Sequence, residues 1–147
     1  MTEKKANRGY LASTLGNYCP RCREGKLFKH KPSFNFNKIN EMHENCTVCG
    51  QPTEIEVGFY YGTGYVSYAV TVGISAFTAI AWWIFIGFSI DDISLLIYWL
   101  ITNGVLLLLT MPLIMRLSRS LWISWFVPYD AHWEDEKPEM SEERIYK

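Results

Sequence analysis

Two cysteine pairs, CPRC at residues 19–22 and CTVC at residues 46–49, precede two long runs without charge, residues 57–90 and 93–115. In a soluble globular domain charged side chains recur every few residues, so uncharged runs of this length are unusual. The sequence therefore predicts a small N-terminal domain stapled through its cysteines, followed by a transmembrane hairpin.

Each uncharged run is long enough to cross a bilayer. About 20 apolar residues with a rise of about 1.5 Å span roughly 30 Å of hydrocarbon, so we expect helices over residues 66–90 and 93–115. The second run holds thirteen Leu, Ile and Val residues. Their insertion energy of about −4 to −8 kcal/mol would outweigh Asn103 even if this residue cost as much as a mid-span charge, about 3 kcal/mol. Two buried helices of a soluble core are the alternative, but little else remains in the chain to cover them.

The distribution of charge predicts the orientation of the hairpin. Residues 1–57 carry nine Lys/Arg and six Asp/Glu, whereas Asp91 and Asp92 separate the uncharged runs. Arg116 and Arg119 follow the second run. Because cytoplasmic flanks of membrane helices are rich in Lys and Arg, we expect a two-pass protein with both termini in the cytoplasm. Cysteines in that reducing compartment more often bind metal than form disulfides.

The cysteine spacing is that of a metal site. Within each C-x2-C pair a tight turn aims both sulfurs at one ion, and two such turns supply four tetrahedral ligands. Gly50 suits the left-handed residue that follows such a turn, and Arg23 stands at the matching place in the first turn. We expect a structural zinc ion bound by all four cysteines: Cys19, Cys22, Cys46 and Cys49.

Other chemistries use the same residues. Iron is bound by the same four thiolates, and spacing does not exclude it. A redox dithiol at Cys19 and Cys22 is possible because a C-P-x-C turn can lower a thiol pKa, but it leaves the second pair unexplained. His43 lies three residues before Cys46 and is more simply outside a completed thiolate site. His30 is expected at the surface.

The expected fold is a β-rich zinc ribbon, a two-helix transmembrane hairpin and a short interfacial helix. Short strands are expected over residues 26–29, 34–37 and 53–57. A ribbon of about 40 residues has little core, so zinc would contribute folding energy of about 10–16 kcal/mol. The expected segments are a flexible leader (1–17), the ribbon (18–57), a hinge (58–65), the two spans (66–90 and 93–115), an interfacial amphipathic helix (116–128) and an acidic tail (129–147).

Polar residues in the spans share one face. Ser67, Thr71, Ser75 and Thr78 recur at spacings of four, four and three, and Asn103 lies midway along the second span. This pattern favours a seam that packs one helix against another over a polar pathway for a ligand. The spans contain no ionisable residue of the kind that forms a proton relay.

The run YCPRCREGKLF at 18–28, the second cysteine pair and the glycine-rich stretch before the spans resemble a bacterial membrane family of unassigned function, the DUF nine-eight-three family. The resemblance covers about residues 18–133. It implies metal binding by the four cysteines, a location in the bacterial inner membrane and a glycine at the membrane boundary, here Gly64. Many relatives carry Gly-Asp-Gly where this chain has Gly62-Thr63-Gly64, so any role of that carboxylate does not carry over.

These features predict a membrane protein that is not an enzyme. We expect an adaptor, assembly or accessory factor whose partners are the lipid bilayer and a larger membrane-protein complex. The sequence is also compatible with a homo-oligomer. The alternative is a metal-handling or thiol-redox membrane protein that uses the four cysteines. Nucleic-acid binding ranks last and is not expected, because the net charge of +3 over residues 1–57 gives it little support.

Overall fold

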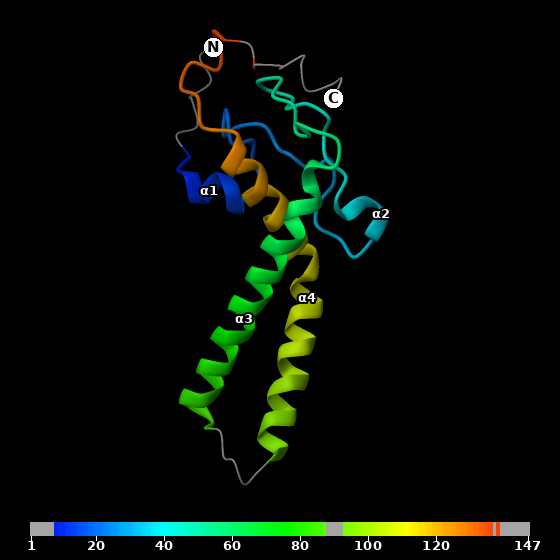
Figure 1. Cartoon of the computed structure of the whole chain (residues 1–147), viewed down its shortest axis with the longest axis vertical. Helices are drawn as coiled ribbons and strands as arrows, with labels where there is room; N and C mark the ends of the chain where they lie inside the picture. The colour runs from blue at the N-terminus through cyan, green and yellow to red at the C-terminus, as the bar shows by residue number, and fades with distance from the viewer. Residues whose placement is uncertain (1–7, 88–92, 137, 139–147) are drawn as a thin grey trace.

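The computed structural model describes residues 8–87, 93–136 and 138, and in it two long antiparallel helices lie side by side with a smaller head at one end (Figure 1). We call the part formed by residues 8–62 and 116–136 the head. The elements in chain order are α1 (Tyr10–Leu15), α2 (Phe36–Ile39), the 3-10 helix η1 (Phe59–Gly62), α3 (Thr63–Phe85) and α4 (Ile93–Phe126).

The two long helices have the length and composition to cross a membrane. In the most apolar stretch of Phe59–Phe85 no residue is buried, and in that of Ile93–Phe126 only 6% are buried. Two core helices of a soluble protein would be mostly buried, so that alternative does not fit the observed exposure. Outside their mutual contact, the helices expose aliphatic and aromatic side chains that a bilayer would cover.

The first long helix starts and ends earlier than expected. Residues 58–65, the expected hinge, form η1 and the first turn of α3. A side chain on Gly62 would collide with the Trp122 ring, so this glycine lets the start of α3 approach α4 closely. After Phe85 the chain turns at Gly87 with a positive φ of 86°, which glycine adopts readily. The predicted end at residue 90, with Asp91 and Asp92, lies outside the described residues.

The prediction of a separate interfacial helix over residues 116–128 is wrong. Helix α4 continues without a break through Pro112 to Phe126. A proline in a helix interior removes one backbone hydrogen bond, but the buried face continues beyond it through Ile114, Ser118 and Ile123. The last third of α4 is therefore part of the head and packs against its loops.

Arg116 connects α4 to the loop between the cysteine pairs through three hydrogen bonds. In the sequence this arginine is a basic flank of the second span, and in the structure it is buried, with the whole residue 3% exposed. It donates hydrogen bonds to the carbonyls of Ile39 at 2.9 Å, His30 at 2.7 Å and Lys31 at 3.0 Å. The planar guanidinium has five donors and can serve several carbonyls together. The loop between the cysteine pairs is thereby fastened to α4.

The β-rich ribbon is not found. The described residues contain no β-strand and only isolated antiparallel bridges, Tyr18 with Lys26, Phe28 with Met42 and Asn45 with Pro52. The segment expected as a strand at 34–37 instead overlaps α2. Many backbone groups between residues 18 and 53 bond within the tight cysteine turns or to single residues of the opposite loop. The short loops therefore pack around the cysteines and α4 without a continuous ladder.

The expected leader and tail are partly ordered into the head. Residues 10–15 form α1, whose Tyr10 hydroxyl lies 2.9 Å from the Ser124 hydroxyl of α4. Beyond α4, the backbone N–H of Asp130 donates to the carbonyl of Arg21, and Trp133 packs against the buried core. The remainder of both predicted segments, residues 1–7, 137 and 139–147, lies outside the described residues.

The polar seam is confirmed at its centre. The Asn103 amide is buried between the helices, where its Nδ2 donates to Ser75 Oγ at 3.1 Å. Thr78 Oγ1 donates to Asn103 Oδ1 at 3.0 Å. Ser67 and Thr71, nearer the start of α3, bond instead to carbonyls of their own helix. The central part of the pattern thus fixes the register of α3 on α4.

We predict that Arg116→Leu destabilises the head by about 3 kcal/mol, because three carbonyls lose their donor and each unsatisfied group costs about 1–3 kcal/mol. Denaturant unfolding followed by tryptophan fluorescence measures the loss. Arg116→Lys should lose most of the same stability, since a lysine cannot donate to the same three carbonyls. Lys31→Gln, an exposed change in the same loop, is the control, and equal stability of all variants would contradict the assignment.

Candidate metal centre

The two cysteine pairs adopt the same local backbone. The N–H of Arg23 donates to the carbonyl of Cys19 at 2.8 Å, and that of Gly50 donates to Cys46 at 2.9 Å. Arg23 and Gly50 both have positive φ, 60° and 72°, so the first turn takes the conformation predicted for Gly50 although an arginine stands at that place. A non-glycine residue in this conformation carries a modest steric cost. Each pair is thus a tight turn that directs two sulfurs to the same side.

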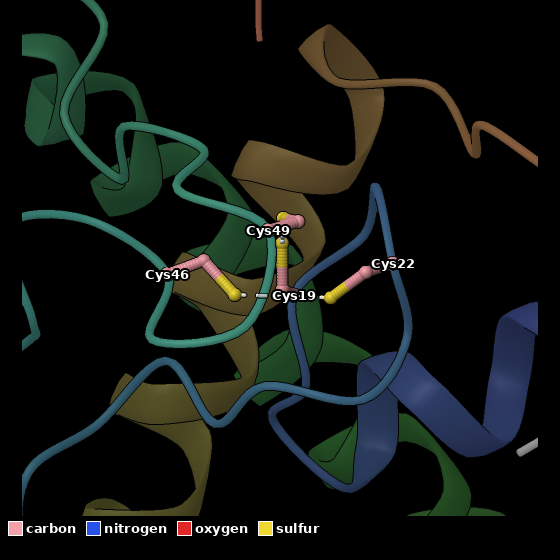
Figure 2. A group of neighbouring side chains, drawn as sticks. All are labelled: Cys19, Cys22, Cys46 and Cys49. Atoms are coloured by element: carbon pink, nitrogen blue, oxygen red, sulfur yellow. Dashed lines mark hydrogen bonds between the residues drawn. The ribbon is translucent and has the colours of Figure 1, made fainter. Parts of the chain in front are cut away.

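All four predicted ligands come together, with Cys19 and Cys22 from one loop facing Cys46 and Cys49 from the other (Figure 2). Their sulfur atoms all lie within 4.8 Å of one another. The separations Cys19 Sγ–Cys49 Sγ and Cys22 Sγ–Cys46 Sγ are both 3.7 Å. Four sulfurs at about 2.3 Å from a tetrahedral zinc ion lie about 3.8 Å apart. The donor set therefore fits such an ion.

The same geometry separates a metal site from a disulfide. All four cysteines are free thiols, and 3.7 Å is far longer than a disulfide bond of about 2.05 Å. Both of these short contacts join one turn to the other. A shared ion explains this cross-pairing and gives the second pair a role, which a dithiol at Cys19 and Cys22 does not. The sulfur arrangement suits zinc and iron alike.

Hydrogen bonds between the crowded thiols shift their pKa values in different directions. The hydrogen bond from the Cys19 thiol is the main reason that the pKa of Cys22 falls to about 6. The same donor lowers the pKa of Cys46. The pKa of Cys19 is raised, chiefly because its thiol proton is shared with Cys22. Metals bind the thiolate, so an ion at this site would take the place of the thiol protons that these sulfurs share.

The cysteines lie in the hydrophobic core of the head and not at its surface. Cys19, Cys22 and Cys46 are 1%, 2% and 4% exposed, and Cys49 is 9% exposed. Leu27 and Phe28 from the first loop join the same core. So do Ile123 from α4 and Val127 just beyond it. Helix α4, which contains the second predicted span, therefore forms one wall of the metal centre with the residues that follow the span.

Gly25 leaves the space that a cysteine sulfur needs. It is buried, and a Cβ atom built there would collide with Cys46 Sγ. Its carbonyl also accepts the N–H of Cys19 at 2.7 Å. Any side chain at this position would push the second cysteine pair away from the first.

Two arginines beside the first cysteine pair contact the segment that follows α4. Arg21, between the first two ligands, is 6% exposed and donates to Asp130 Oδ2 at 2.9 Å. The guanidinium of Arg23 lies 4.0 Å from the centre of the Tyr129 ring. The segment that follows α4 is held over the first cysteine pair by both arginines.

Neither His30 nor His43 joins the ligand cluster. The ligand-type atoms that converge in the described ranges are the four sulfurs alone. His43 instead uses its backbone N–H to bond the Leu27 carbonyl. His30 is exposed and its Nε2 lies 3.0 Å from Glu41 Oε2, which confirms its expected place at the surface.

Three contributors to this site escape sequence reasoning: Gly25, Ile123 and Val127. Gly25 is visible beside the first pair, but only the close approach of Cys46 gives it a purpose. Ile123 and Val127 lie within the expected interfacial helix 116–128, and nothing local indicates that they pack against loops far earlier in the chain.

No family model, no curated protein and no solved structure matches this chain. The resemblance to the DUF nine-eight-three family therefore remains a prediction.

We predict about one tightly held metal ion per chain, and its loss in Cys46→Ser, because a hydroxyl is a poor substitute for a thiolate on a soft ion. Elemental analysis of protein purified without added metal gives both stoichiometry and identity. The control is Thr47→Ala, an exposed change within the same turn. A folded wild-type protein without metal would contradict the prediction.

We predict that Ile123→Ala destabilises the head by about 2–4 kcal/mol, the usual cost of a cavity at a fully buried aliphatic residue. Ile123 is 0% exposed and packs in the core that contains the cysteines, so metal should also pass more quickly to a chelator. Leu113→Ala, at a residue that is 55% exposed on the same helix, is the matched control. Equal rates of metal release in the two variants would show that α4 does not support the site.

Proposed function

We propose that this chain is a non-enzymatic integral membrane protein that acts as an adaptor, assembly or accessory factor for a larger membrane complex. In this proposal α3 and α4 form a two-pass hairpin in the bacterial inner membrane, with both termini in the cytoplasm. The head holds a structural zinc ion and serves as a rigid docking platform beside the inner leaflet. The observation that carries the proposal is the packing of the buried cysteine cluster directly on α4.

The character of the cysteine site supports a structural ion. Structural zinc sites are closed by four protein ligands, whereas catalytic sites keep a position open for water or substrate. Four converging sulfurs supply a complete tetrahedral set, and all four cysteines are at most 9% exposed. This burial also favours a structural role over metal exchange or thiol redox chemistry, which require access to the sulfurs.

The continuity of α4 supports a platform that is fixed relative to the membrane. A zinc domain on a flexible linker could rotate freely, but here Arg116 and Ile123 tie the cysteine loops to the helix itself. A partner that contacts both the hairpin and the head would then meet one rigid surface. Rigid surfaces bind with less loss of conformational entropy, which suits an assembly factor.

The proposal predicts a stable membrane-protein partner. Affinity purification of the full chain from native membranes in mild detergent, after brief crosslinking, should recover that partner with the zinc-loaded protein. Cys46→Ser should lose most of it, while Thr47→Ala should retain it. Membrane extraction of both variants verifies that the hairpin still inserts. Recovery of the wild-type chain only as a monomer would reject an adaptor role, and rapid loss of metal to weak chelators would favour metal handling instead.

A further inference from the structure

An open groove runs along the head beside the place where α4 ends. Its volume is about 1050 Å³. Loop residues 40, 42–45 and 51–55 line it together with residues of η1 and residues 126–128 and 130. The groove is distinct from the metal centre, since none of the four cysteines lines it. A space of this size is comparable to known ligand sites.

The charge of the groove favours a cationic occupant. Two arginines and four acidic residues line it. Arg21 is already paired with Asp130 at 2.9 Å, and the Arg119 guanidinium lies 4.8 Å from the centre of the Tyr60 ring. The other three acidic residues have exposed side chains: Glu44, Glu54 and Glu136. The groove thus presents more negative than positive charge to an incoming ligand.

Two buried polar atoms of the groove residues lack a hydrogen-bond partner within the described part of the chain, Arg21 Nη1 and Asn40 Oδ1. Arg21 is 6% exposed, and its other nitrogens bond Asp130 and the carbonyl of Glu136. Because Asp130 already balances its charge, the remaining N–H suits a neutral acceptor such as a main-chain carbonyl. Asn40 Oδ1 requires a donor. An extended peptide supplies both groups along its backbone.

We propose that this groove binds an extended, Lys/Arg-rich cytoplasmic segment of the partner membrane protein. The inference rests on the proposed function and names the chemistry of its docking site. Membrane proteins carry Lys and Arg close to the cytoplasmic ends of their helices. The groove is lined by Tyr60 and Tyr61 just before α3 and by Arg119, one helical turn beyond the predicted end of the second span. It therefore lies at the depth where such a segment leaves the bilayer.

The test uses the full, zinc-loaded chain in nanodiscs of uncharged lipid, so that lipid does not attract the probe. Fluorescence anisotropy measures binding of a short labelled peptide of alternating Lys and Ser. Wild-type protein should bind it in a salt-sensitive manner. Glu44→Gln combined with Glu54→Gln should weaken binding about fivefold to tenfold, as expected for the loss of two exposed charge pairs. Glu134→Gln, an exposed acidic residue that does not line the groove, should bind like wild type.

Asn40→Ala separates main-chain recognition from simple charge attraction. This substitution should weaken binding of the Lys-containing peptide. It should not change the salt dependence of that binding, because it removes a hydrogen-bond acceptor and no charge. Absence of binding, equal binding by the double variant, or equal binding of a Glu/Ser peptide would overturn the inference. Zinc content and partner recovery are measured on the same preparations. Protein that holds zinc and captures its partner yet ignores the peptide rejects the groove assignment while leaving the proposed function intact.

Discussion

The packing of α4 against the cysteine loops is the contact on which the rest of the structure depends. Ile123 and Val127 share one buried core with the four cysteines, Leu27 and Phe28. A domain of about 40 residues has too little apolar surface to fold without a staple or a partner. Here the partner belongs to the same chain, so the head borrows one wall of its core from the helix that continues toward the predicted membrane span.

This arrangement couples the metal to the hairpin. Arg116 binds three carbonyls of the loop between the cysteine pairs, and residues beyond α4 return to Arg21 beside the ligands. Because ligand binding and folding are linked in small metal domains, an ion at the four sulfurs would stabilise the loops and their seat on α4 together. The docking groove is lined by residues of these same elements, but none of the four cysteines lines it.

The sequence predicted the chemistry of the site more accurately than the fold around it. A C-x2-C turn is a local structure, and its need for a left-handed residue correctly identified Gly50, while Arg23 adopts the same conformation at the matching place without being a glycine. Two such pairs also sufficed to predict that four sulfurs converge. The expected strands were wrong because alternation over four or five residues is a weak signal. In this head isolated bridges and packing on α4 replace a sheet.

The sequence by itself determined two long apolar helices, a polar seam between them and a set of four converging cysteines. Each follows from local spacing or from unbroken runs of one residue type. Only the tertiary structure decided that α4 passes Pro112 and becomes part of the head. It likewise decided that Arg116 is buried against loop carbonyls and that Gly25 makes room for Cys46. These features depend on contacts between residues far apart in the chain. Side-chain periodicity predicts which face of a helix is buried but does not predict which distant segment covers it.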